Sequence, residues 1–121
     1  MIEYNRIDRA VTTLVADDDL VMLRITARLL RKVGYEVIEA ASGPEALRLV
    51  SEKAPDLAIL DVVMPGIDGV EVCRRIKGDE ELQGVYVMLL SGVHTESESQ
   101  ATGLEAGADD YVARPVSNQE L

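Results

Sequence analysis

The sequence contains neither phenylalanine nor tryptophan. A hydrophobic core must therefore consist mainly of Leu, Val, Ile, Ala and Met side chains, a composition that suits the buried parallel strands of α/β proteins. The one cysteine, Cys73, excludes an intrachain disulfide and fits a reducing compartment. We expect Cys73 to be a small core residue, because it lies in an apolar stripe at helical spacing.

Long apolar runs and an excess of positive charge are missing as well. No apolar stretch approaches the roughly 20 residues that a transmembrane helix requires, and residues 1–11 lack the apolar segment of a signal peptide. Lysine and arginine number 12 against 22 acidic residues, a net charge of -10 that disfavours direct nucleic-acid binding. We therefore expect a cytoplasmic protein without membrane or nucleic-acid contacts, with a lead-in at residues 1–11 and one compact domain at 12–121.

Short apolar segments alternate with amphipathic stretches. The predicted strands are 12–16, 36–40, 57–60, 85–90 and 110–113. The predicted helices are 20–33, 42–53, a third that contains 72–76 and ends at Gly78, and 96–106. This alternation predicts βαβ units. The expected fold class is α/β: a doubly wound five-stranded parallel sheet, (βα)5, in a three-layer sandwich, with a fifth helix that begins at Ser117 and is truncated at the C-terminus.

Capping residues and apolar spacing support these helices. Asp19 is the expected N-cap of the first helix, and Ser42 and Glu45 have the spacing of a capping box. Apolar residues of the first helix recur at spacings of three and four, which predicts one buried face. That face is Leu20, Leu23, Ala27, Leu30 and Val33. The helix at 96–106 is polar, and its thin inner face is expected to include Leu104.

Polar side chains collect where the predicted strands end. Asp17 and Asp18 follow the first strand, Asp61 the third, Ser91 the fourth and Arg114 the fifth. Ligands of doubly wound sheets bind at this edge, so we expect these side chains to share one crevice. Three carboxylates in one crevice repel one another unless a cation compensates them. Because hard oxygen ligands suit Mg²⁺, the pattern predicts a site for Mg²⁺ or Mn²⁺.

The same crevice has the groups that phosphoryl transfer needs. A carboxylate such as Asp61 can act as a nucleophile and form an aspartyl phosphate. Ser91 could donate a hydrogen bond to one phosphoryl oxygen, and Arg114 could neutralise another. Since positioning and charge neutralisation are the main requirements of phosphoryl transfer, the residues favour that chemistry.

Four motifs make the sequence resemble bacterial two-component response-regulator receiver domains, from about Thr13 to Leu121. They are LVADDD at the first strand, DLAILDVVMPGIDG around Asp61, MLLSG at the fourth strand and GADDYVARP at the fifth. The resemblance implies a flavodoxin-like phosphoacceptor domain in a phosphorelay. It also implies a histidine kinase or phosphotransfer domain as donor, and a partner or linked output domain that is switched.

The resemblance implies roles for the acids of the crevice. Asp61 matches the phosphorylated aspartate of the family. Asp18 matches a direct metal ligand, Asp17 matches one that acts through water, and the backbone carbonyl of Val63 supplies a further ligand. Asp19 is expected to cap the helix and not to bind the metal.

Other implied roles concern the switch. Phosphorylation would pull Ser91 inward and Tyr111 would follow, which would reshape the surface of helix four, strand five and helix five; that surface also allows a dimer. Arg114 departs from the family, which usually has lysine before this proline. Arginine keeps the charge on a larger planar group. The family's usual cis peptide is expected at Arg114–Pro115, and Arg114 is expected to pair with Asp61 or to point just past it.

Three other functions compete with this one. A pseudo-receiver would bind partners without being phosphorylated, and Arg114 keeps that alternative open. A phosphatase with an aspartate nucleophile would need a second acid two residues after Asp61, where Val63 stands. A flavodoxin-like cofactor site is disfavoured because three aspartates after the first strand would repel a phosphate. We therefore expect a signalling domain that phosphorylates itself and not an enzyme, with a linked kinase module beyond residue 121 as one option.

Overall fold

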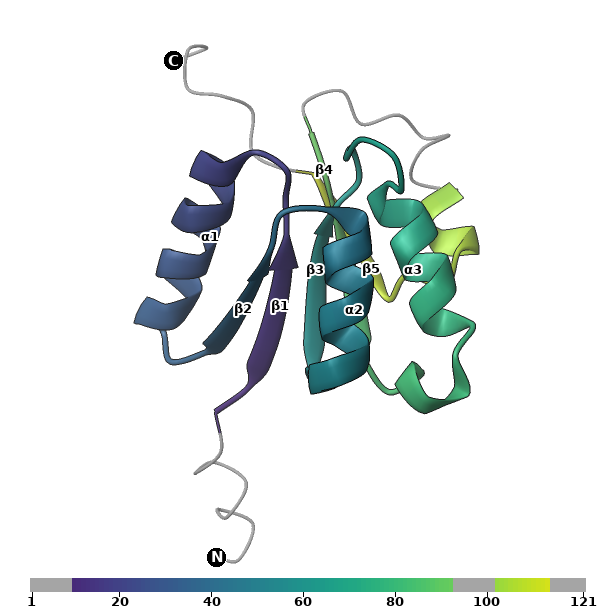
Figure 1. The fold of residues 1–121 in the computed structure, drawn as a ribbon, viewed down its shortest axis with the longest axis horizontal. Helices are drawn as coiled ribbons and strands as arrows, with labels where there is room; N and C mark the ends of the chain where they lie inside the picture. The colour runs from purple at the N-terminus through teal and green to yellow at the C-terminus, as the bar shows by residue number, and fades with distance from the viewer. Residues whose placement is uncertain (1–9, 93–101, 114–121) are drawn as a thin grey trace, which may run out of the picture.

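The computed structural model describes residues 10–92 and 102–113, and its ribbon is shown in Figure 1. Five parallel strands form one sheet in the order β2-β1-β3-β4-β5. The strands are β1 Thr12–Ala16, β2 Glu36–Ala40, β3 Leu57–Asp61, β4 Tyr86–Ser91 and β5 Asp110–Ala113. The helices are α1 Leu20–Lys32, α2 Gly43–Lys53, α3 Gly69–Lys77 and the 3₁₀ helix η2 Glu80–Leu82, and residues 102–105 are helical as well. The strand order reverses between β1 and β3, which is where such sheets bind ligands.

The predicted fold class is confirmed, with small changes at the element ends. The bounds of β1, β2 and β5 are those predicted, whereas β4 begins and ends one residue later than expected. The 3₁₀ helix η2 was not predicted from the sequence. Asp79 caps this single turn by accepting the N–H of Glu81 at 2.9 Å, a local interaction too short to produce a helical period.

The sheet separates two groups of core residues. α1 lies on one side of it, and α2 and α3 lie on the other (Figure 1). On the α2 and α3 side, the fully buried strand residues include Leu14, Ala58, Leu60, Val87 and Leu89. Cys73 of α3 packs among them as expected, and burial raises the pKa of its thiol to about 11. On the other side, Val15 and Ile59 pack against Leu23 of α1.

Two predictions about helix faces were wrong. Leu20 and Val33 were placed on the buried face of α1, but they are 60% and 70% exposed: Leu20 is the first residue of the helix, and Val33 follows its last residue as the C-cap. Leu104 was expected to face the core and is also exposed. Gly103 is buried instead, and a Cβ there would lie 2.9 Å from atoms of both Leu89 and Tyr111. The helical segment therefore contacts the sheet through its backbone.

Lys77, the last residue of α3, connects this helix to β4 and β5. Its ammonium lies 2.7 Å from Oδ2 of Asp109 and donates to the carbonyl of Val85 at 2.7 Å. The same carboxylate oxygen accepts the N–H of Val87 at 2.8 Å. Burial alone would raise the pKa of Asp109, but the hydrogen bonds from Lys77 and Val87 outweigh it and hold that pKa below its ordinary value.

We expect Asp109→Asn to destabilise the fold at pH 7 by about 1–2 kcal/mol. This is near or below the lower end of the roughly 1.5–3 kcal/mol for hydrogen bonds to charged groups, because the pair is partly exposed. The folded-state pKa of Asp109 is lowered, so its contribution is fully present above the ordinary value of 3.8 and is lost as pH falls through the folded value. In urea unfolding, the difference between wild type and variant should therefore narrow below about pH 4. The exposed Glu105→Gln is the control, and equal stability of Asp109→Asn and wild type at pH 7 would contradict the prediction.

Several predictions lie outside the described residues. They concern the lead-in, most of the helix at 96–106, Arg114 with its cis peptide to Pro115, the fifth helix and the dimer surface to which that helix contributes. The division of the chain at residues 11 and 12 stays a prediction. In the part of the chain that is described, no helix is both long and apolar enough to cross a membrane.

Candidate functional site

Three carboxylates meet at the carboxyl ends of β1 and β3. Asp17 and Asp18 directly follow β1, and Asp61 is the last residue of β3. Each offers an oxygen atom, and these atoms lie within 4.8 Å of one another. The two strands are neighbours, with Ala16 opposite Leu60, so the register itself brings the following residues together. The structure thus gathers the three acids that the sequence places at strand ends.

The donor set fits a divalent cation with oxygen ligands. An ion that holds oxygens at ~2.1 Å separates opposite ligands by about 4 Å, so the cluster has the size of one ion. Asp17 is only 2% exposed, Asp61 is half-buried and Asp18 is exposed. Carboxylates this close repel one another, most strongly where water is excluded, and a cation would relieve that repulsion. The residues therefore fit Mg²⁺ or Mn²⁺.

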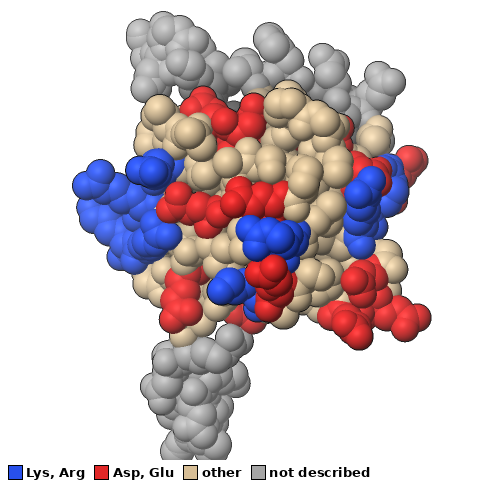
Figure 2. Space-filling model, in the orientation of Figure 1, with Lys and Arg blue, Asp and Glu red and all other residues tan. Residues whose placement is uncertain are grey.

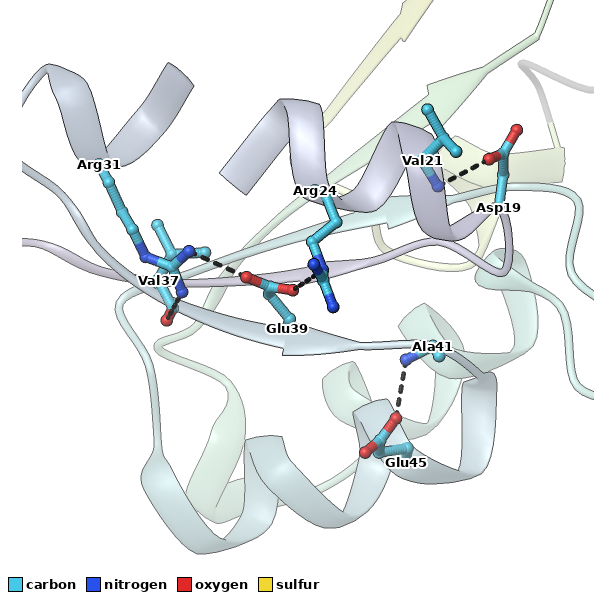
Figure 3. A network of polar contacts seen from close by, with 8 residues as sticks. All are labelled: Asp19, Val21, Arg24, Arg31, Val37, Glu39, Ala41 and Glu45. Carbon is cyan, nitrogen blue, oxygen red and sulfur yellow. Dashed lines mark hydrogen bonds and ion pairs between the residues drawn. The ribbon is translucent and has the colours of Figure 1, made fainter. Parts of the chain in front are cut away.

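Asp17 and Asp19 have distinct local contacts. The carboxylate of Asp17 accepts the N–H of Asp19 at 3.0 Å. Asp19 caps α1 as predicted, because its carboxylate accepts the N–H groups of Val21 and Met22 at 3.0 and 3.2 Å. The first of these bonds is drawn in Figure 3. Asp19 is therefore used by the helix, whereas Asp17 belongs to the cluster.

Charged contacts also hold α1 against the edge strand β2. The guanidinium of Arg31 lies 2.9 Å from Glu39 and also donates to the carbonyl of Val37 at 3.1 Å. Arg24 approaches the same carboxylate at 3.7 Å (Figure 3). These contacts fix the helix whose first turn begins beside the acids.

Asp61 stands at the start of a tightly held loop, residues 62–68. Its carboxylate accepts the N–H of Val63 at 3.4 Å, and the N–H of Val62 donates to the carbonyl of Leu90 in β4 at 2.9 Å. A Cβ on Gly69 would lie 2.9 Å from the carbonyl carbon of Asp61, so α3 begins directly against the backbone of Asp61. This role of Gly69 was not predicted from the sequence. The available signal was a glycine at the first position of a helix, where other residues are normally favoured.

The two implied switch residues lie on one face of the sheet. Ser91 ends β4, one residue beyond Leu90, which pairs with Asp61, and it is buried. Tyr111 in β5 pairs with Leu89, two residues before Ser91, and its ring packs on the core between the sheet, α2 and α3. Its hydroxyl is buried and has no hydrogen-bond partner among the described residues. The switch roles stay a prediction, as does the role of Arg114, which lies outside those residues.

Comparisons with known proteins agree with this arrangement. The response regulator receiver domain family matches residues 13–121. The transcriptional regulatory protein AfsQ1 of Streptomyces coelicolor is 43% identical over 108 residues, which cover 89% of this chain and 46% of that protein. A response regulator from Chloroflexus aurantiacus has a TM-score of 0.83 and 38% identity, with 93% of this chain and 91% of that one covered. The receiver domain of a signal transduction histidine kinase from Syntrophus aciditrophicus has a TM-score of 0.80 and 32% identity, with 92% and 83% covered.

The receiver domain family matches nearly all of this chain, whereas the chain matches only part of the full-length relatives. The chain spans less than half the length of the transcriptional regulators that it resembles. The family match, in contrast, covers four complete strands, all but the first residue of β1, and all three acids of the cluster. Sheet order, acid cluster and similarity lead to the same result: the chain belongs to the family of response regulator receiver domains.

Proposed function

We propose that Asp61 accepts a phosphoryl group from a phosphohistidine donor in a two-component phosphorelay. The observation that carries this proposal is the cluster of Asp17, Asp18 and Asp61, whose oxygens lie within 4.8 Å of one another at the strand ends. A bound Mg²⁺ or Mn²⁺ would neutralise charge on the phosphoryl oxygens. Asp17 and Asp18, with the carbonyl of Val63 and Asp61 itself, would hold that ion.

The chain's own residues then position the reaction. A carboxylate oxygen of Asp61 attacks phosphorus in line; the new O–P bond forms while the P–N bond to the donor histidine breaks, and the histidine nitrogen keeps the electron pair. The hydroxyl of Ser91 donates a hydrogen bond to a phosphoryl oxygen, and Arg114 neutralises another. Movement of Ser91 and Tyr111 reports the modification to the surface around β5, which biases a two-state equilibrium. The domain modifies itself once and is not an enzyme acting on many substrates.

The surface of α1 supports a protein donor. Basic side chains gather over this helix, at the left of Figure 2, although the chain as a whole is acidic. They are Arg24, Arg28, Arg31 and Lys32, and exposed Val21, Ile25 and Leu29 lie among them. A mixed apolar and basic surface on the helix that begins beside the acids suits an acidic, partly apolar protein. We propose that a histidine kinase or its phosphotransfer domain docks there, in the cytoplasm, and that a linked or separate output module reads the switch.

A labelling experiment tests the proposed function. Wild type, incubated with a small phosphodonor and Mg²⁺, should gain one phosphoryl group by mass spectrometry, in an alkali-labile acyl linkage. Removal of the metal with a chelator should abolish the label, and Mn²⁺ should restore it, because the three carboxylates otherwise repel the donor. A phosphorylated histidine-containing domain in place of the small donor tests the partner class. Wild type that stays unlabelled, while Arg114→Lys is labelled strongly, would favour the pseudo-receiver instead.

A further inference from the structure

The first residue of α2, Gly43, lies against the loop at 62–68 that follows Asp61. Gly43 is buried, and a Cβ built on it would overlap the carbonyl oxygen of Ile67. The same Cβ would lie 3.0 Å from the Cβ of Ile67 and 3.2 Å from its carbonyl carbon. Two of these three atoms are backbone atoms, which cannot rotate away as a flexible side chain can. Any residue larger than glycine would therefore push helix and loop apart.

Backbone conformation does not explain a glycine at this position. The positive-φ glycines among the described residues are Gly34, Gly66 and Gly107, and Gly43 is not one of them. Glycine is also a poor helix former, so α2 itself gains nothing from it. Close approach to Ile67 is the remaining physical reason for a glycine here.

The loop that Gly43 touches is anchored at its other points as well. The N–H of Gly69 donates to the carbonyl of Val62 at 3.0 Å, which closes the loop on itself. Met64 within the loop is buried in the core. Gly69 lies against the backbone of Asp61. Together with the contact between Gly43 and Ile67, the loop is therefore held by β4, by the hydrophobic core, by α3 and by α2.

Two side-chain hydrogen bonds hold the N-terminus of α2. The hydroxyl of Ser42 accepts the N–H of Glu45 at 3.2 Å. The carboxylate of Glu45 accepts the N–H of Ala41 at 2.7 Å, as Figure 3 shows. The predicted capping box is thus formed with one change, since the carboxylate bonds the residue before the N-cap. Two hydrogen bonds fix the helix start at the point where it meets the loop.

We propose that Gly43 is a positioning residue for the acceptor site: α2 contacts Ile67 and so fixes the position of the loop whose Val63 carbonyl would serve as a metal ligand. This inference rests on the proposed function and adds a residue to it that touches neither metal nor phosphoryl group. A Cβ at residue 43 would displace the loop and move one metal ligand relative to the three carboxylates.

Calorimetric Mg²⁺ titration of the full chain tests this inference. Gly43→Ala should weaken Mg²⁺ binding by about tenfold or more, the usual loss when a residue that supports a ligand is changed. Amide NMR signals of residues 62–68 should shift in the variant before metal is added. Gly84→Ala is the matched control, since a Cβ at Gly84 meets nothing within 4 Å and its φ is not positive, and its affinity should equal that of wild type.

The Mg²⁺ affinities of the variants support or overturn the role of Gly43. Wild-type affinity in a folded Gly43→Ala would overturn the inference. If Gly43→Ala does not fold, Ser42→Ala replaces it, because this change removes the cap that holds the helix start without adding atoms. Weaker Mg²⁺ binding in folded Ser42→Ala would support the inference, and unchanged binding would overturn it. Wild type that binds no Mg²⁺ would instead overturn the proposed function, and with it the inference.

Discussion

Asp61→Asn should abolish phosphorylation completely while the protein stays folded. The amide has nearly the shape of the carboxylate and can still accept the N–H of Val63, which the carboxylate accepts at 3.4 Å. It is neutral, however, and a poor nucleophile, so no acyl phosphate forms. Mass spectrometry after incubation with a small phosphodonor and Mg²⁺ should therefore show label on wild type and none on the variant.

Asp79→Asn is the control for this substitution. Asp79 is exposed and caps η2, away from the acid cluster, and asparagine also caps helices well. It removes the same charge without touching the site, so labelling should match that of wild type. Label that persists in Asp61→Asn at the wild-type level would show that another residue is the acceptor.

Asp17→Asn should have opposite effects on Mg²⁺ affinity and on stability. Asp17 is almost fully buried within 4.8 Å of two other carboxylates, so its charge is repelled where water screens little. In wild type the carboxylate of Asp17 accepts the N–H of Asp19 at 3.0 Å. The side-chain oxygen of an asparagine can accept the same N–H, and the neutral amide removes the repulsion between charges. Without metal we expect the free energy of unfolding to rise by about 1 kcal/mol, the weak end of such interactions.

The same substitution removes a candidate metal ligand. We expect Mg²⁺ affinity to fall at least about tenfold. Substitution of a residue that only supports a metal ligand already lowers metal affinity by roughly this factor, and Asp17 is itself a candidate ligand. Urea unfolding with and without Mg²⁺ measures both effects, because the stabilisation of wild type by Mg²⁺ increases with the logarithm of its affinity at a fixed concentration. Asp79→Asn again serves as the charge control. A variant that is less stable than wild type without metal would refute the repulsion, and unchanged Mg²⁺ affinity would remove Asp17 from the metal site.

Local interactions explain why much of the fold could be predicted. The strand at 36–40 and the one at 110–113 have their predicted bounds, because each places adjacent apolar residues, Val37–Ile38 and Tyr111–Val112, next to polar residues that limit the strand. Asp19 and Ser42 cap their helices through hydrogen bonds that span two or three residues. Such contacts depend on neighbours in sequence, so the residue pattern alone indicates them.

The acid cluster could be predicted for a related reason. Asp17 and Asp61 each come directly after an apolar run of the sequence, and the parallel strands that these runs form end at one edge of the sheet. Their convergence therefore needs only the fold class and not the packing. The sequence could not predict that Asp17 would be buried while Asp18 is exposed, because this depends on the direction in which the chain leaves β1.

Residues far apart in the sequence meet only in the tertiary structure. Lys77 and Asp109 form an ion pair although 31 residues lie between them in the sequence. No local sequence pattern indicates that these two residues meet. Gly43 looks like a weak helix start until Ile67 lies against it. The sequence alone determined the elements, their caps and the edge of the sheet where the acids gather, since these follow from spacing along the chain. Packing decided which acid is buried and which glycine supports the loop, because steric exclusion acts between atoms that only the folded chain brings together.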